Sequence, residues 1–210
     1  MRVSQCMHVS LITVHKETTL AQALDLLHTH RIRHLLVVEG DRLLGILTDR
    51  DIRQASPSNA AGSSPEQIAA FLARIPVGQV MARDVRTVSP YTPIEEAARL
   101  MIDHKIGCLP VMEGERLVGI ITETDILTVL VDLMGIHEPS SRIELLLPDR
   151  PDALAEVTRI IREHQVNIAS VVTMPHREAG RRLVILRLTT IHPQPILKDL
   201  AAAGYHHPPP

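Results

Sequence analysis

Residues 45–51 read GILTDRD, and the pattern returns at residues 119–125 as GIITETD. Gly45 and Gly119 are 74 positions apart, and this offset holds without a gap from residue 3 to residue 52 of the first copy. One register kept over such a length is typical of an internal repeat. We therefore expect each copy to be one structural unit that is used twice.

Each copy has the apolar pattern of a β-α-β-β-α unit. In the first copy a short strand at 12–14 precedes a helix that starts near Thr18, and strands at 35–38 and 43–47 follow. A second helix begins near residue 49. In the second copy, Thr92 is the expected N-cap and Pro93 the first helical residue. A unit of this size cannot bury its own sheet and helices, so we expect the two copies to pack as a pair.

Composition excludes several classes of protein. The chain has 210 residues and a formal net charge of −2, so no overall field favours nucleic acid or a membrane surface. No apolar run approaches the roughly 20 residues that cross a bilayer, and the start of the chain does not resemble a signal peptide. Two cysteines, Cys6 and Cys108, make no disulfide framework. We expect a cytoplasmic protein with no nucleic-acid or membrane partner.

The heptapeptides at 45–51 and 119–125 resemble the Gly-h-x-Thr-x-x-Asp signature of CBS domains, where h is apolar. The resemblance extends from residue 3 to about residue 130. CBS pairs commonly bind AMP, ADP, ATP or S-adenosylmethionine, so it implies an adenine nucleotide as a regulatory ligand. It leaves open whether Mg²⁺ accompanies the nucleotide, and it implies no required cofactor.

The resemblance also implies the residues of the ligand site. Two strand segments, Thr13-Val14 and Thr87-Val88, are expected to meet the adenine, and a second wall comes from the segments containing His34 and Leu36 or Cys108 and Pro110. The remaining expected contacts are Thr48, Arg50 and Asp51 in the first copy and Thr122, Thr124 and Asp125 in the second.

The spacing of Thr48 and Asp51 has a physical interpretation of its own. The threonine ends a buried strand, and the aspartate lies three residues later on the first turn of a helix. A carboxylate suits a ribose diol, whereas the threonine hydroxyl and free backbone N–H groups suit a phosphate. The alternative is that the two residues only cap the helix. The copies also differ, because Arg50 offers a cation where the second copy has Thr124.

The last third of the chain predicts a second module, with strands at 142–147, 167–174 and 183–188 and helices at 153–164 and 194–203. This order, together with the stretch LPDRPDAL at 147–154, resembles an ACT domain, a ferredoxin-like module that often binds amino acids. The implied ligand loop contains Asp149, Arg150, Asp152, Asn167 and Ile168. Asp152 stands where the family usually has glycine, and it adds bulk and negative charge. The final strand is expected to be missing, because prolines follow residue 207.

The sequence thus predicts an α+β protein made of two CBS repeats and a ferredoxin-like ACT domain that lacks its last strand. The expected segments are 1–55, a linker with a short helix at 56–76, 77–136, 141–205 and a disordered tail at 206–210. Together they resemble the acetoin-utilisation protein B family. We expect a homodimeric regulatory protein that acts on an unknown downstream protein. It is not expected to be an enzyme or to hold a metal site, because no catalytic constellation or set of metal ligands stands out. The alternatives are an amino-acid sensor acting through the ACT domain and a structural interaction module.

Overall fold

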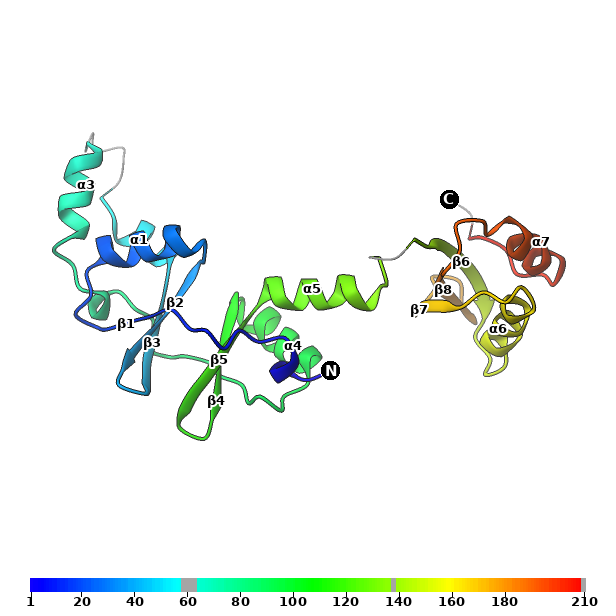
Figure 1. The fold of residues 1–210 in the computed structure, drawn as a ribbon, viewed down its shortest axis with the longest axis horizontal. Coiled ribbons are helices and arrows are strands. Elements are labelled where there is room, and N and C mark those ends of the chain that lie inside the picture. The colour runs from blue at the N-terminus through cyan, green and yellow to red at the C-terminus, as the bar shows by residue number, and fades with distance from the viewer. Residues whose placement is uncertain (58–63, 137–138, 209–210) are drawn as a thin grey trace. The chain divides into compact units, whose positions relative to one another are not determined.

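The computed structural model describes residues 1–57, 64–136 and 139–208 and shows a mixed α+β fold (Figure 1). The chain divides into two compact units, Met1–Ile126 and Leu127–Pro210, and the division falls within helix α5 (Glu123–Leu133). Among the helices in the described ranges, none has the length and apolar character needed to cross a membrane. Each unit has a hydrophobic core of its own.

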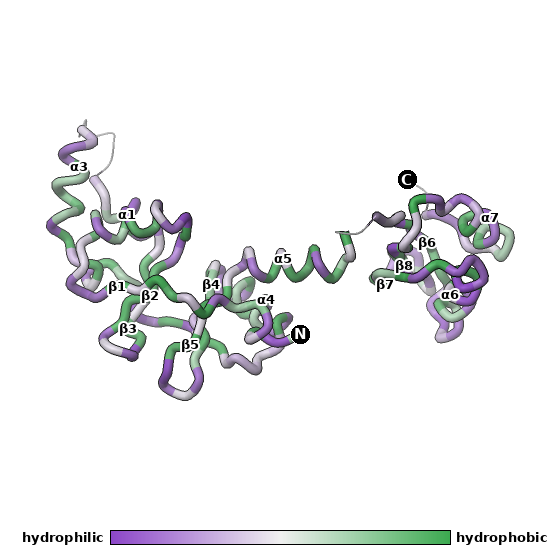
Figure 2. The backbone as a smooth tube through the Cα atoms, in the orientation of Figure 1, coloured by the Kyte–Doolittle hydropathy of each residue, from purple (hydrophilic) through white to green (hydrophobic). Residues whose placement is uncertain are grey.

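The first repeat forms the expected β-α-β-β-α unit. Its elements are β1 (Thr13–Val14), α1 (Leu20–His30), β2 (His34–Glu39), β3 (Arg42–Thr48) and α2 (Asp49–Ala55). Strand β2 lies at the centre of the sheet, parallel to β1 and antiparallel to β3. It carries four consecutive buried residues, which Figure 2 shows as a hydrophobic stretch. Burial on both faces explains why this strand has no alternating pattern.

The second repeat has the same order of elements. After the linker helix α3 (Pro65–Leu72) come α4 (Ile94–His104), β4 (Cys108–Glu113), β5 (Arg116–Thr122) and α5. The expected cap of α4 is wrong by one residue: Pro93 is the N-cap, without a side-chain hydrogen bond. The hydroxyl of Thr92 instead accepts a hydrogen bond from the backbone N–H of Ser89 at 3.1 Å. In the first repeat the N-cap is likewise one residue later than expected, at Thr19.

The opening segment of each repeat packs on the other repeat. The backbone N–H groups of Val3 and Ser4 donate to the carbonyl oxygens of Thr92 and Pro90, at 2.9 Å each, next to the start of α4. The corresponding N–H groups of Val77 and Gly78 donate to Thr18 and Lys16 beside α1, at 2.7 and 2.8 Å. Val77 is completely buried in the core of the first repeat. The two repeats therefore exchange their first residues, so neither copy of the sequence is a self-contained unit.

The same exchange continues along the strands. His8 forms a two-hydrogen-bond bridge with Ile120 on β5, and Ala82 forms the corresponding bridge with Ile46 on β3. The adjacent glycine of each motif makes room for the crossing chain. A Cβ added at Gly45 lies 2.6 Å from the carbonyl oxygen of Ala82, and one added at Gly119 lies 2.7 Å from the sulfur of Met7. Close packing between the repeats thus requires the glycine that begins each motif.

The C-terminal unit is a three-stranded antiparallel sheet covered by two helices. Its elements are β6 (Ser141–Pro148), α6 (Ala153–Glu163), β7 (Ile168–Pro175), β8 (Arg181–Leu188) and α7 (Gln194–Ala202). The strand order is β6-β8-β7, and the core lies between the sheet and the two helices. This is the ferredoxin-like arrangement with no fourth strand in the described part of the chain.

One residue beyond α7 still pairs with the free edge of β6. The carbonyl oxygen of His206 accepts a hydrogen bond from the backbone N–H of Leu146 at 3.1 Å, and Tyr205 is buried beside it. The expected disordered tail is therefore wrong at His206. The prolines that follow have no N–H to continue a ladder, which explains why the pairing stops. Residues 209–210 of the expected tail lie outside the described residues.

The close approach at the two motif glycines gives a prediction about stability. Gly45→Ala and Gly119→Ala should each lower the free energy of unfolding by about 1–3 kcal/mol, because a methyl group overpacks the crossing segment. Urea denaturation at a fixed pH measures the change. Gly40→Asn is the control, because a Cβ at Gly40 meets nothing within 4 Å and asparagine tolerates its positive φ of 59°. Equal losses in all three variants would contradict the steric explanation.

Candidate functional site

The Thr-x-x-Asp motif forms a capping box in both repeats. The backbone N–H and the hydroxyl of Thr48 both donate to Oδ2 of Asp51, at 2.8 and 2.6 Å, and the N–H of Asp51 donates back to the threonine oxygen at 3.2 Å. Thr122 and Asp125 repeat this geometry at 2.8, 2.8 and 3.3 Å. The capping interpretation is thus correct for one carboxylate oxygen in each motif. The other carboxylate oxygen, Oδ1, takes no part in the capping box.

Two pockets lie next to these motifs, both within the N-terminal unit. We name them after the aspartate in each: the Asp125 pocket has a volume of about 300 Å³ and the Asp51 pocket about 440 Å³. Such volumes are at the lower end of the range for small-molecule sites. Each pocket joins the Thr-x-x-Asp motif of one repeat to residues that follow the first helix of the other. His34 and Arg33 line both pockets.

The Asp125 pocket combines the second motif with the first repeat's opening and β2. Besides the two shared residues, its lining is His8, Ser10, Leu11, Ile12, Arg31, Ile32, Leu36, Ile120, Thr122, Thr124 and Asp125.

The Asp51 pocket has the reverse composition, with the first motif facing the second repeat. Its lining adds to the shared residues Ile46, Thr48, Asp49, Arg50, Asp51, Arg53, Ala82, Asp84, Val85, Arg86, Lys105, Ile106, Gly107, Cys108 and Glu123.

The structure brings together nine of the fourteen residues expected for the nucleotide site, and it separates five. Those lining a pocket are Thr48, Arg50, Asp51 and Cys108, then Leu36, Thr122, Thr124 and Asp125, with His34 in both. Leu36 lies opposite Thr122–Asp125 and not beside Arg50, where we expected it. The reason is the exchange of opening segments, which sets each motif against the other repeat.

The residues expected to contact adenine do not line either pocket. Thr13, Val14, Thr87, Val88 and Pro110 are not among the lining residues of either pocket. Val14 and Val88 point into the core instead, with exposed fractions of 4% and 7%. The walls pass through residues 11–12 and 85–86, two positions earlier. That wall was missed because the strand residues meet the core, whereas the residues just before the strand border the pocket.

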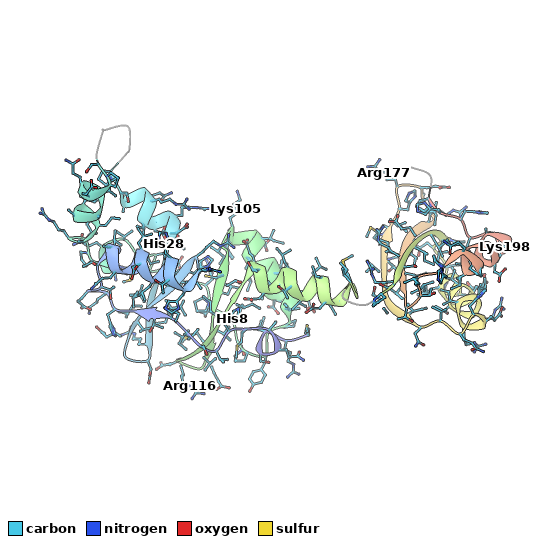
Figure 3. All side chains as sticks on the ribbon, turned by 45° about the horizontal axis from the view of Figure 1, so that its top comes forward. His8, His28, Lys105, Arg116, Arg177 and Lys198 are labelled. Atoms are coloured by element: carbon cyan, nitrogen blue, oxygen red, sulfur yellow. The ribbon has the colours of Figure 1, made fainter. Side chains whose placement is uncertain are left out.

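The Asp51 pocket is lined by charges of both signs, five cationic side chains and the four carboxylates of Asp49, Asp51, Asp84 and Glu123. Arg53 forms an ion pair with Asp49 at 2.7 Å. Arg33, Arg50, Arg86 and Lys105 also line this pocket, and none of them forms an ion pair with another residue in the described ranges. Lys105, labelled in Figure 3, ends α4 in the left-handed conformation at φ 54°, as Arg31 ends α1 at φ 53°. This helix ending places a cation at the mouth of each pocket.

Two groups in the pocket walls, the half-buried His34 and the buried Cys108, stay uncharged near neutral pH. Burial lowers the pKa of His34 below its ordinary value of 6.5, and the neighbouring Arg33 lowers it further. Burial and the nearby Glu123 raise the pKa of the Cys108 thiol to about 12. The thiol therefore remains protonated and acts as a small apolar wall, not as a nucleophile. No group of His, Cys, Asp and Glu residues in the described ranges is arranged to hold a metal ion.

The expected ligand loop of the C-terminal unit is closed by its own side chains. Arg150 forms ion pairs with Asp152 and with Glu156, the latter at 2.8 Å, and the Tyr205 hydroxyl donates to Glu156. The hydrogen bonds that Glu156 accepts from Tyr205 and from Arg150 lower its pKa. Asp152 is the N-cap of α6, but its side chain makes no capping hydrogen bond. The residue that replaces the family glycine is thus held by Arg150 across the loop.

The other residues of the expected ligand loop contact neighbouring parts of the C-terminal unit. Asp149 lies 3.7 Å from the guanidinium of Arg182, and the carbonyl oxygen of Asn167 accepts a hydrogen bond from the Thr189 N–H at 3.0 Å. Ile168 begins β7, where it pairs with Leu188. These contacts hold the loop and the strand together.

Comparison with known families agrees with this organisation. The CBS domain family matches residues 3–58 and 77–132, and the ACT domain family matches residues 141–204. A CBS domain-containing protein of Dictyostelium discoideum is 36% identical over 141 residues, which cover 66% of this chain and 97% of that protein.

Two solved structures show the same fold over the repeat region. One is assigned as an acetoin utilization protein (AcuB) from Vibrio cholerae, with 34% identity, a TM-score of 0.52, and coverage of 65% of this chain and 94% of the other. The second is the CBS domain pair of protein MJ0100 in complex with 5′-methylthioadenosine and S-adenosyl-L-methionine. It has 27% identity, a TM-score of 0.53, and coverage of 63% and 97%.

The repeats, the exchanged opening segments and the ferredoxin-like C-terminal unit thus have one common explanation: this chain belongs to the CBS-domain family, with a pair of CBS domains followed by an ACT domain.

Proposed function

We propose that this protein is a regulatory ligand-binding protein in which an adenosine-containing nucleotide occupies the CBS pair and modulates the dimer or a partner protein. The candidate ligands are AMP, ADP, ATP and S-adenosylmethionine, with or without Mg²⁺. The complex of MJ0100 with two adenosine derivatives supports this class of ligand, because that CBS pair has the same fold. A regulatory role also fits the protonated thiol at Cys108, which offers no nucleophile.

The observation that carries the proposal is the chemistry of the Asp51 pocket. Oδ2 of Asp51 is occupied by Thr48, but Oδ1 has no partner among the described residues. This oxygen can accept a hydrogen bond from a ribose hydroxyl. Arg50, Arg86 and Lys105 supply positive charge for a phosphate within the same pocket. A nucleotide site needs a hydrogen-bond acceptor for the sugar and positive charge for the phosphate, and this pocket offers both.

The apolar part of the ligand has a matching wall. Ile46, Val85 and Ile106 line the Asp51 pocket beside the protonated thiol of Cys108. The chain has only three aromatic residues, Phe71, Tyr91 and Tyr205, and none of them lines either pocket. A base is therefore expected to lie between aliphatic side chains, held by its shape and by backbone hydrogen bonds and not by stacking.

Amino-acid sensing through the ACT domain is the less favoured function. Arg150 is the cation that a ligand carboxylate would need, but Asp152 and Glu156 already neutralise it. A ligand would have to displace both carboxylates. The structure therefore favours a structural role for this loop over ligand binding.

The proposed nucleotide site predicts a loss of binding on removal of one charge. Asp51→Asn should weaken nucleotide binding at that pocket by about tenfold or more, which corresponds to the loss of a hydrogen bond to a charged group. The asparagine oxygen can still cap α2, so the fold is preserved. Isothermal titration calorimetry with ATP, AMP and S-adenosylmethionine measures the change. Asp103→Asn, an exposed substitution on α4 outside both pockets, is the control. Unchanged affinity in Asp51→Asn would refute the site.

The lowered pKa of His34 predicts a dependence of stability on pH. The unfolded state takes up a proton at His34 near pH 6.5, whereas the folded state resists it. Stability from this group is therefore complete above about pH 6.5 and decreases as the pH falls toward the folded pKa. His34→Gln should lose less stability than the wild type between about pH 7.5 and 5.5. Urea denaturation at the two pH values tests this, and parallel losses in both proteins would contradict it.

We further propose that two copies of the chain associate. Helix α5 alternates between hydrophobic and hydrophilic residues (Figure 2), and Leu127, Leu130 and Leu133 on it have exposed fractions of 60%, 52% and 61%. Their spacing of three places them along one side of the helix. Strand β7 is also an unpaired sheet edge in the C-terminal unit, with Val171 and Met174 exposed. Self-association covers such apolar stripes and edges in the simplest way.

The dimer is tested by mass in solution. Light scattering at low micromolar concentration should give at least twice the chain mass of 23.3 kDa. Leu130→Glu should shift the protein toward the monomer, whereas Thr128→Glu, on the same helix and also exposed, should leave the mass unchanged. A wild-type monomer under these conditions would rule out the dimer.

A further inference from the structure

The two pockets have the same backbone framework, and their side chains differ at several corresponding positions, three of which bear on nucleotide binding. Relative to the Asp51 pocket, the Asp125 pocket has His8 for Ala82, Ile12 for Arg86 and Thr124 for Arg50. Each difference changes a group that a nucleotide would contact. The repeat therefore provides an internal comparison, in which one pocket serves as the reference for the other.

The first difference decides whether the aspartate is available. Nε2 of His8, labelled in Figure 3, lies 2.8 Å from Oδ1 of Asp125 and donates a hydrogen bond to it. Oδ2 of Asp125 is already taken by Thr122. Both oxygens of this carboxylate are therefore engaged, and its side chain is only 13% exposed. At the corresponding position Ala82 has no polar side chain, so Oδ1 of Asp51 keeps its capacity to accept a hydrogen bond.

The other two differences add two guanidinium groups to the Asp51 pocket, which the carboxylates of Asp49, Asp84 and Glu123 also line. Arg50 and Arg86 border the Asp51 pocket from opposite repeats, and neither forms an ion pair with a residue in the described ranges. In the Asp125 pocket these positions hold Thr124 and Ile12, which carry no charge. A triphosphate carries several negative charges, and each unpaired guanidinium can bind phosphate oxygens through two parallel hydrogen bonds. The larger volume, about 440 against about 300 Å³, favours the same pocket.

We infer that the pair is functionally asymmetric: the Asp51 pocket is the site for a polyphosphate nucleotide, and His8 closes the Asp125 pocket to a ribose by occupying Asp125. This inference rests on the proposed function, because it requires that the CBS pair bind a nucleotide at all. His8 is then a specificity-determining residue, whose side chain occupies the acceptor that the ligand would use. Arg50 and Arg86 select for the length of the phosphate chain.

The first experiment counts sites by calorimetry with ATP. The wild type should bind one ATP per chain, and Asp51→Asn should weaken that site by about tenfold or more, whereas Asp125→Asn should leave it unchanged. His8→Ala should open a second, weaker site, because it gives the Asp125 pocket the residue that the other repeat has. The backbone bridge between His8 and Ile120 does not depend on the side chain, so this variant keeps the fold.

The reciprocal change is the matched control. Ala82→His places a histidine next to Asp51 and should weaken ATP binding at the existing site by about fivefold, the upper range for an exposed ion pair. Together, His8→Ala and Ala82→His move the histidine that bonds to the aspartate from the Asp125 pocket to the Asp51 pocket. A change in only one direction, with no second site in His8→Ala, would overturn the role of His8.

A second experiment tests selection for phosphate. Arg50→Thr and Arg86→Ile copy the residues of the other repeat into the Asp51 pocket. Each should weaken ATP binding by about tenfold but adenosine binding by less than about threefold, because only the phosphate contacts are lost. Equal losses for ATP and adenosine would overturn the assignment of these arginines.

The outcomes separate the inference from the proposed function. Two equivalent ATP sites in the wild type, unaffected by His8→Ala, would overturn the asymmetry but leave nucleotide binding by the pair established. The asymmetry would likewise be overturned if Asp125→Asn removed the wild-type site and Asp51→Asn did not. No binding of ATP, AMP, adenosine or S-adenosylmethionine by the wild type or by His8→Ala would overturn the proposed function itself.

Discussion

The reciprocal exchange of opening segments is the constraint on which the paired repeats depend. Residues around Met7 and Met81 each cross the β-hairpin of the other repeat, and the carbonyl and N–H groups of His8 and Ala82 complete two backbone bridges there. Gly45 and Gly119 lie under these crossings, at distances that a Cβ does not allow. Separation of the repeats would exchange these hydrogen bonds for bonds to water, and each typically contributes about 0.5–1.5 kcal/mol net. The exchange thus joins the repeats more firmly than side-chain packing alone.

The exchange also creates the pockets. Because each opening segment lies across the other repeat, the Thr-x-x-Asp motif of one copy meets the segment that follows the first helix of the other. Neither repeat has a pocket of this composition by itself. The left-handed helix ends at Arg31 and Lys105 complete the geometry, since they turn the chain and leave a cation at each rim. Duplication therefore gives two sites at once, and later substitutions can change either one without disturbing the shared framework.

The sequence predicts this fold well where the signal is local. The repeat offset, the strands around Leu36 and Ile46 and the helix starting at Asp49 follow from periodicity and turn residues, and each matches the structure within one or two positions. The cap of α4 was misplaced because Thr92 and Pro93 both satisfy the pattern of a helix start. Only the hydrogen bond between Thr92 and Ser89 distinguishes them, and it depends on the turn before the helix.

The site was predictable in its residue types but not in its pairing. Thr48, Asp51 and their counterparts stand out because a short motif at a strand-to-helix junction is visible in one dimension. The partner of each motif is not visible, because the exchange depends on contacts between residues far apart in the sequence, such as Ile46 with Ala82. The sequence repeat predicts that the copies pack as a pair but not which segments they exchange, and Leu36 was therefore assigned to the first copy's motif although it lines the Asp125 pocket.

The C-terminal unit shows how a ligand fold can keep its architecture while its loop changes. Asp152 stands where a small residue is usual, and its exposed carboxylate takes an ion-pair partner from the same loop. Arg150 supplies one and also contacts Glu156, which in turn accepts a hydrogen bond from Tyr205 after α7. The chain that follows Tyr205 gives one backbone hydrogen bond to β6 before the prolines end the pairing. The loop, the helix and the segment after α7 are therefore linked by one set of contacts. Arg150 and Tyr205 both bind Glu156, so the loop before α6 and the chain after α7 share one carboxylate.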